Sequence, residues 1–165
     1  YQMIGYTPKR DYQYVAINQR LRVLHAEIVT DVVRTIESLC GRRIPIDPES
    51  CMLELNNNLF VSVVISRCFI TPAGTRRWKI RFDSGLRPDI TVAVRMNIRN
   101  EAIQDYYILP ALEFSDGQLK LSEDNAGFLD GFRTDTLDYL LKLSVNISLD
   151  KAVEHGSWGR SAYSH

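Results

Sequence analysis

Three runs of β-forming residues lie close together between residues 59 and 96, and they constrain the fold more than any other part of the chain. The runs LFVSVVISRCFI (59–70) and RRWKIRF (76–82) flank the turn sequence TPAGT (71–75), and DITVAVRM (89–96) follows. β-Branched and aromatic residues favour strands, whereas the Pro and Gly between the runs favour turns. The spacing therefore predicts an antiparallel meander of three strands.

The second of these runs alternates basic and large apolar residues. Because successive side chains of a strand point to opposite faces, the basic residues share one face and the apolar residues share the other. The basic residues are Arg77, Lys79 and Arg81, and the apolar residues are Trp78, Ile80 and Phe82. The apolar face predicts a contact with the core, and we expect Trp78 to be buried against a long helix.

That helix is predicted by apolar residues that recur every three or four positions from Tyr14 to Leu39. It starts at residue 8 or 12 and ends at residue 40, because Gly41 favours the end of a helix. Thr7 is suited to cap its first turn.

Shorter runs predict further elements on both sides of the meander. CMLEL (51–55) predicts a strand that is followed by a turn at Asn56–Asn58, and QDYYILPALEF (104–114) predicts a strand that ends near Pro110. A short strand is predicted at LKL (119–121). The helical period returns from about Asn125, in Leu129, Phe132, Leu137, Leu140 and Leu141.

This order of elements predicts an α+β fold. We expect an antiparallel sheet of about five strands, with the long N-terminal helix and the C-terminal helix on one face. Residues 1–149 are predicted to form a single domain, and 150–165 a C-terminal extension with a short likeness to an affinity tag. Because the chain starts at Tyr1, we expect it to be a piece of a longer protein.

The composition is ordinary for a globular protein, with 45% hydrophobic and 24% charged residues. No apolar run approaches the roughly 20 residues that a membrane-spanning helix needs. We therefore expect a cytoplasmic protein without a membrane partner. The three cysteines, Cys40, Cys51 and Cys68, are odd in number and widely spaced, so we predict core thiols rather than disulfides or a zinc site.

Charge is distributed unevenly along the chain, although the net charge is zero. Residues 59–100 contain eight basic and two acidic side chains, whereas residues 101–150 contain three basic and ten acidic ones. A basic sheet surface favours binding to nucleic-acid phosphates. The alternative is that the two segments neutralise each other across an internal contact. The candidate nucleic-acid-binding residues are Arg67, Arg76, Arg77, Lys79, Arg81 and Arg95.

Residues suited to catalysis are scarce. The histidines are His25, His155 and His165, and we interpret His25 as a helix-surface residue rather than a general base. Glu27 and Asp31 stand one helical turn apart, a spacing that suits a metal site, but a solvated helix face explains them more simply. We expect no cofactor.

A helix followed by a three-stranded meander resembles the core of the PD-(D/E)XK, or restriction-endonuclease-like, superfamily. The resemblance implies a metal site made of a helix glutamate, an aspartate at the start of the second strand, and a Glu-x-Lys on that strand. Glu27 matches the helix acid, but the aspartate falls on Asn57 or Asn58, and the Glu-x-Lys falls on 65–67, where the sequence is Ile-Ser-Arg. Because neutral side chains lack the charge that holds a divalent metal, the resemblance implies a degenerate, inactive relative.

An alternative acidic cluster consists of Glu54, Asp83 and Asp89, although nothing in the spacing of these residues singles it out.

A second resemblance is to uncharacterised α-proteobacterial sequences that are labelled recombinase. The similar phrases lie at 4–11, 71–83, 88–96 and 104–110. This resemblance implies an accessory or DNA-engaging region of a protein that acts on DNA.

We therefore favour a non-catalytic, DNA-associated module that binds the phosphate backbone through a basic sheet surface. The alternative is a protein-interaction domain that forms a homo-oligomer, in which the acidic region 101–138 of one copy meets the basic sheet of another. A metal-dependent nuclease is the third hypothesis. We also expect the basic surface and the acidic second helix to lie on different sides of the domain.

Overall fold

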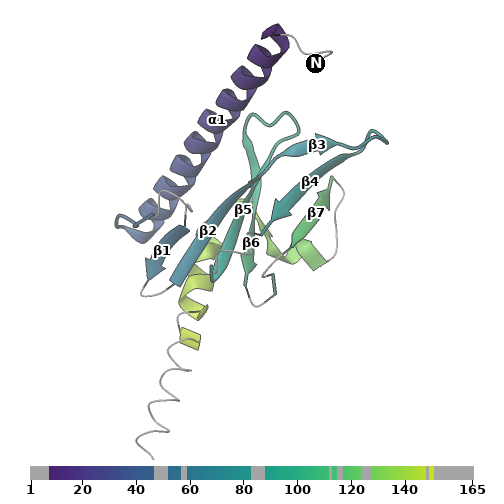
Figure 1. Cartoon of the computed structure of the whole chain (residues 1–165). Helices are drawn as coiled ribbons and strands as arrows, with labels where there is room; N and C mark the ends of the chain where they lie inside the picture. Colours follow the sequence, from purple (N-terminus) through teal and green to yellow (C-terminus); the bar gives the residue numbers. More distant parts are fainter. Residues whose placement is uncertain are drawn as a thin grey trace, which may run out of the picture. The chain divides into compact units, whose positions relative to one another are not determined.

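The structure is a computed structural model. It describes residues 8–46, 52–56, 59–82, 88–111, 113–114, 117–123, 128–147 and 149–150. The chain divides into two compact units, Tyr1–Arg34 and Thr35–His165, and both sheets belong to the second unit. The class is α+β, as predicted, with helices near both ends of the chain and two sheets between them (Figure 1).

The N-terminal helix α1 spans Pro8–Cys40, which confirms the predicted long helix and its end. The chain leaves this helix at Gly41, whose φ of 71° lies in the left-handed region that favours glycine. The N–H of Gly41 donates to the carbonyl oxygen of Glu37 at 2.8 Å, and the Glu37 carboxylate accepts the N–H of Ile44 at 2.9 Å. Both interactions fix the direction in which the chain continues.

The larger sheet is mixed. Its strands, in spatial order, are β1 (Met52–Asn56), β2 (Leu59–Ser66), β5 (Ile90–Met96), β6 (Ile103–Pro110) and β8 (Arg133–Thr134). The strands β2 and β5 are parallel, and the other neighbouring strands are antiparallel. The prediction of five antiparallel strands is therefore correct in number for this sheet and wrong for the β2–β5 pair.

The parallel pair arises because the chain leaves the larger sheet after β2. It forms the hairpin of β3 (Cys68–Ile70) and β4 (Arg76–Arg81), which belongs to a second, antiparallel sheet with β7 (Gln118–Ser122). Parallel neighbours need such a crossover connection. The predicted meander is therefore wrong, whereas its first turn is confirmed: the N–H of Gly74 donates to the carbonyl of Thr71 at 2.8 Å.

The predicted strand at 59–70 is divided at Arg67, where the chain passes from one sheet to the other. Two side chains bind backbone groups at this transition. The hydroxyl of Ser66 donates to the carbonyl of Lys79 at 2.7 Å, and the amide of Asn100 accepts from the Cys68 N–H at 2.6 Å and donates to its carbonyl at 3.0 Å. The side chains of Ser66 and Asn100 therefore satisfy backbone groups of Lys79 and Cys68 near the point where the chain changes sheets.

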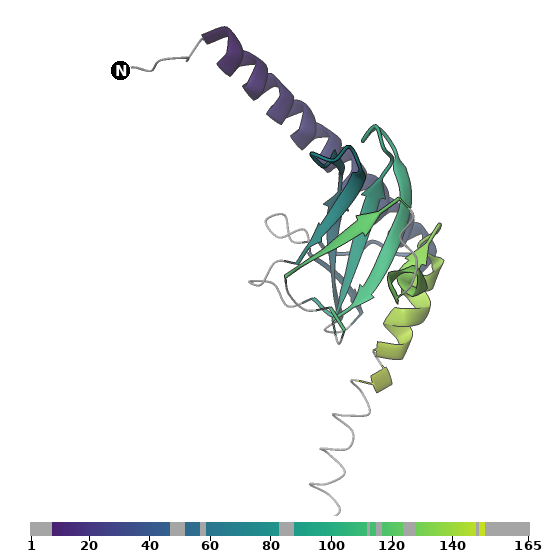
Figure 2. The same ribbon diagram turned by 90° about the vertical axis from the view of Figure 1, so that its right-hand side faces the viewer.

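The two sheets pack against each other around a shared apolar core (Figure 2). Its buried members are Trp78, Ile80 and Leu121 from the smaller sheet, Ala93, Tyr107 and Leu109 from the larger sheet, and Phe114. The prediction that Trp78 is buried is confirmed, with 1% of its surface exposed. The predicted contact with the long helix is not found among the described residues, because the other buried members of this core come from the two sheets and from Phe114.

The predicted C-terminal helix is interrupted. A short 3-10 helix (Phe128–Phe132) precedes β8, and the α-helix occupies residues 138–147. The interruption has a local cause, because the Thr134 hydroxyl donates to the carbonyl of Thr136 at 2.9 Å and accepts its N–H at 3.3 Å. Such bonds compete with helical hydrogen bonding.

Several predictions fall on positions outside the described residues, namely Asn57, Asn58, Cys51, Asp83, the helix start at Asn125 and the extension beyond residue 150. Within the described part of the chain, no helix is long and apolar enough to cross a membrane. Cys40 and Cys68 are free and half-buried, and Cys68 packs against the shared core.

Candidate nucleic-acid interface

The outer surface of the smaller sheet gathers basic side chains from two strands. In β4, Trp78 and Ile80 point into the core, so alternation turns the residues between and beside them outward. The register then places the outward residues of β3 and β7 beside them. We call this surface the basic sheet face, and it consists of Phe69, Arg77, Lys79, Arg81, Gln118, Lys120 and Ser122.

At the centre of the basic sheet face, Lys79 and Lys120 are direct partners across antiparallel strands. The Cβ atoms of such partners lie about 4.5–5.5 Å apart, and like charges in this position destabilise a sheet. Arg77 and Arg81 flank the pair on the same strand face. The strands β3, β4 and β7 contain no Asp or Glu, so the face has no acidic member of its own.

Phe69 is the aromatic residue of the basic sheet face. The Nζ of Lys79 lies 5.0 Å from the centre of its ring, a cation–π contact that holds the lysine over the sheet surface. This contact positions the Lys79 charge without neutralising it.

The six basic residues predicted from the sequence do not act as one group. Arg77, Lys79 and Arg81 lie together as predicted. Arg76 instead forms an ion pair with Glu123 at 3.3 Å, and both side chains are exposed. Arg67 lies at the transition between the sheets, half-buried, and its Nε is buried without a hydrogen-bond partner in the described structure.

Arg95 is not available to a nucleic acid, which corrects its assignment to the basic surface. It is 6% exposed, and two of its nitrogens bind the carboxylate of Asp105 at 2.8 and 2.6 Å. Its guanidinium stacks over Trp78 and Tyr107, at 4.8 and 5.4 Å from the ring centres. Burial alone would lower the pKa of Arg95, but the hydrogen bonds and charge of Asp105 raise it above its usual value.

Asp105 also links this buried pair to the surface. It accepts a hydrogen bond from Arg133 at 3.2 Å, and Arg133 binds the exposed Asp135 at 2.8 Å. Burial raises the pKa of the neighbouring Tyr107 hydroxyl. The cluster is therefore a charge network that holds β5, β6 and β8 together rather than an anion-binding surface.

Lys120 was not among the candidates from the sequence. The apolar–basic–apolar pattern at 119–121 predicts a strand with a basic outer face, and β7 confirms the strand. The sequence alone does not show that this strand pairs with β4. That pairing, with Lys79 opposite Lys120, is what brings Lys120 into the basic sheet face.

In the described part of the chain, no ion pair joins the acidic segment to the basic sheet face. Among the described residues, Arg77 and Arg81 form no ion pair with Asp130, Asp135 or Asp138, and Asp135 is bound to Arg133. The internal neutralisation that the sequence leaves open is therefore formed in part, by Arg76 with Glu123 and by Arg95 with Asp105, but these side chains lie outside the basic sheet face.

The predicted metal ligands that the structure describes belong to other elements than the strands of the basic sheet face. Glu27 and Asp31 are exposed on α1, and Ile65 lies in β2 with an apolar side chain. Glu54 is the cross-strand partner of Phe60, whose N–H donates to the Asp89 carboxylate at 2.8 Å. In the described ranges, no three His, Cys, Asp or Glu side chains gather closely enough to hold a metal ion.

No protein-family model and no curated protein matches this sequence. Among solved structures, the fold is similar to that of a bacterial homing endonuclease, I-Ssp6803I, with a TM-score of 0.43 and 14% sequence identity. The similarity covers 74% of this chain and 94% of the endonuclease chain. At this identity the similarity concerns the fold.

Proposed function

We propose that the protein is a non-catalytic module that binds the DNA phosphate backbone through the basic sheet face. The observation that carries the proposal is the central pair of Lys79 and Lys120, flanked by Arg77 and Arg81 on three strands that contain no Asp or Glu. Trp78, Ile80 and Leu121 on the inner face of the same sheet are buried in the core, so the register that brings the two lysines together is set by the core.

A bound polyanion would remove the electrostatic repulsion between Lys79 and Lys120. Like charges in direct cross-strand positions destabilise a sheet, and phosphates placed over them would replace repulsion with attraction. Three strands span about 10 Å, and double-stranded DNA carries one negative charge per roughly 1.7 Å of its axis. A duplex therefore presents enough phosphates under this face to neutralise its four basic groups.

Binding to a duplex should depend steeply on salt. With four phosphate contacts, the slope of log K against log salt concentration should be about −3.6, so the affinity should fall roughly 100-fold between 50 and 200 mM salt. The variant Lys79→Gln/Lys120→Gln should lose about two units of that slope. Fluorescence anisotropy of a labelled duplex across a salt series measures both quantities.

The matched control is Arg42→Gln/Arg43→Gln, which removes the same net charge from exposed positions outside this sheet. This control should keep the slope of the unchanged protein. A slope near zero in the unchanged protein, or one that the lysine variant leaves intact, would contradict the proposal.

Self-association is the second candidate, because Asp130 and Asp138 are exposed and form no ion pair in the described structure. An acidic segment of one copy would then meet the basic sheet face of another. Sedimentation velocity distinguishes the two functions. Salt-sensitive oligomers that disappear in Lys79→Gln/Lys120→Gln, without any duplex binding, would favour self-association.

We expect no metal-dependent DNA cleavage. The Glu-x-Lys position of the restriction-endonuclease-like pattern holds Ile65, whose apolar side chain cannot bind a divalent cation. Incubation of supercoiled plasmid with the protein and Mg²⁺ or Mn²⁺ should leave the plasmid intact. Cleavage that needs the metal and is lost in Glu27→Ala would overturn this expectation.

A further inference from the structure

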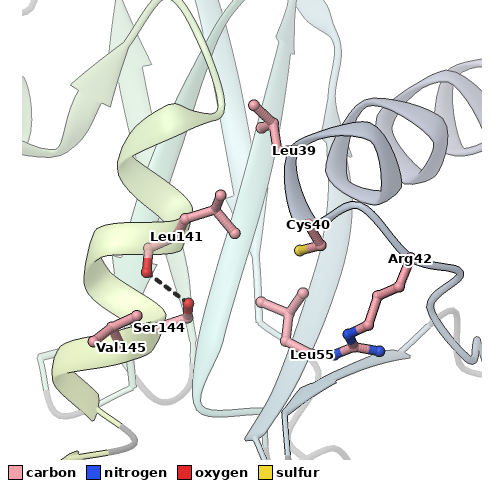
Figure 3. A pocket seen from close by; sticks show the side chains of 7 residues that line it. All are labelled: Leu39, Cys40, Arg42, Leu55, Leu141, Ser144 and Val145. Carbon is pink, nitrogen blue, oxygen red and sulfur yellow. Dashed lines mark hydrogen bonds between the residues drawn. The ribbon is translucent and has the colours of Figure 1, made fainter.

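A pocket of about 290 Å³ lies between the last turn of α1, the strand β1 and the helix at 138–147 (Figure 3). Its walls are mainly apolar: Leu39, Leu55, Leu141 and Val145 line it together with Cys40, Arg42 and Ser144. Leu55 is 1% exposed, whereas Leu39 and Val145 are 36% and 52% exposed. The pocket therefore has a buried apolar floor and an apolar rim in contact with water.

The two small polar groups of the pocket, the Ser144 hydroxyl and the Cys40 thiol, do not need a polar partner on the ligand. The Ser144 hydroxyl already donates to the carbonyl of Leu141 at 2.7 Å, within its own helix (Figure 3). The Cys40 thiol is half-buried, and burial raises its pKa although Arg42 opposes the effect, so the group stays uncharged at neutral pH. An apolar ligand can contact both residues without leaving a charge buried.

Arg42 is the charged residue of the pocket. Its side chain is exposed, and its hydrogen bond to the carbonyl of Arg43 is long, at 3.3 Å. The nearby Glu37 carboxylate is bound to the N–H of Ile44. Within the described residues Arg42 forms no ion pair, so its guanidinium can receive an anion from outside.

We propose that this pocket binds a small apolar monocarboxylate, with its hydrocarbon part between the leucines and its carboxylate on Arg42. The planar guanidinium fits a carboxylate through two parallel hydrogen bonds. The volume lies just below the roughly 300–1,000 Å³ of ligand pockets, which favours a small ligand. This site is separate from the basic sheet face, and the proposal does not depend on DNA binding.

Titration of the full chain with three octyl compounds tests the choice of head group. Octanoate, octanol and octyltrimethylammonium share the hydrocarbon part and differ in charge. Octanoate should bind at least about tenfold more tightly than octanol, because hydrogen bonds to charged groups are the stronger ones, and the ammonium should bind most weakly. Isothermal titration calorimetry measures all three dissociation constants.

Arg42→Gln should abolish the preference for octanoate over octanol, whereas Arg43→Gln should keep it, because Arg43 is exposed and does not line the pocket. Val145→Trp places a large side chain at the exposed rim and should weaken the binding of octanoate and octanol alike. Undetectable octanoate binding, equal affinities for octanoate and octanol, or a preference that survives Arg42→Gln would each overturn the proposal.

A second measurement locates the ligand without any substitution. Bound octanoate should slow the alkylation of Cys40 by iodoacetamide, and peptide mass mapping reports each cysteine separately. Cys68 is the internal control, because it is also half-buried but lies in β3, away from the pocket lining. Equal rates at Cys40 with and without saturating octanoate would contradict the assignment of the site.

Discussion

Asp105→Ala is expected to lower the free energy of unfolding by about 3–5 kcal/mol, because it leaves a buried guanidinium without its counter-charge. The side chains of Arg95 and Asp105 are 7% and 2% exposed, and two hydrogen bonds join them. After the substitution, water can solvate Arg95 only by entering the core between the sheets. Urea unfolding followed by circular dichroism measures the loss.

The control replaces both members of the pair. In Arg95→Met/Asp105→Leu no charge remains buried at this position, so most of the lost stability should return. Arg133, the other partner of Asp105, keeps its ion pair with Asp135 in either variant. If Asp105→Ala is as stable as the unchanged protein, Arg95 is solvated and does not belong to the core.

Local features of the sequence predict the parts of the fold that depend on neighbouring residues. The end of α1 is one example, because Gly41 follows a regular apolar period and adopts the left-handed conformation. The hairpin of β3 and β4 is another, since TPAGT lies between two β-forming runs. In both cases the determining residues lie within a few positions of the element.

Strand partners could not be predicted in the same way. The run 59–70 has uniform β-forming character, yet it changes sheets at Arg67. The hydrogen bonds at this transition join residues that are far apart in sequence, Ser66 with Lys79 and Cys68 with Asn100. Strand propensity carries no information about such partners, nor about the parallel pairing of β2 with β5.

The candidate site likewise has features that neighbouring residues determine and features that residues far apart in sequence determine. Alternation within β4 correctly groups Arg77, Lys79 and Arg81, because a single strand determines it. Arg95 was assigned to the basic surface because it belongs to the basic segment 59–100. Its register partner across the turn between β5 and β6 is Asp105, and an opposite-charge pair in this position is the signal that marks Arg95 as internally neutralised.

Trp78 holds the sheet that carries the basic sheet face against the larger sheet. Its ring lies beneath the Arg95 guanidinium, and its Nε1 donates to the carbonyl of Met96 at 2.8 Å. Arg95 and Met96 belong to β5 in the larger sheet, whereas Trp78 belongs to β4 in the smaller one. One side chain therefore connects the two sheets by packing, by a hydrogen bond and by a cation–π contact.

Trp78→Ala is accordingly expected to lower the free energy of unfolding by about 3–5 kcal/mol, because it removes a large core side chain that is 1% exposed. Trp78→Phe keeps an aromatic ring under Arg95 but leaves the Met96 carbonyl without its donor, so its loss should be smaller, about 1–3 kcal/mol. Urea unfolding of both variants measures the difference.

Fluorescence provides an independent check on the environment of Trp78. The chain has two tryptophans, and Trp158 lies outside the described residues, so the measurement is made in a Trp158→Phe background. The remaining indole should emit at short wavelength in the native state and shift to long wavelength on unfolding, because burial shields it from water. A native spectrum typical of a water-exposed indole, or equal stabilities of Trp78→Ala and Trp78→Phe, would show that this ring does not connect the two sheets.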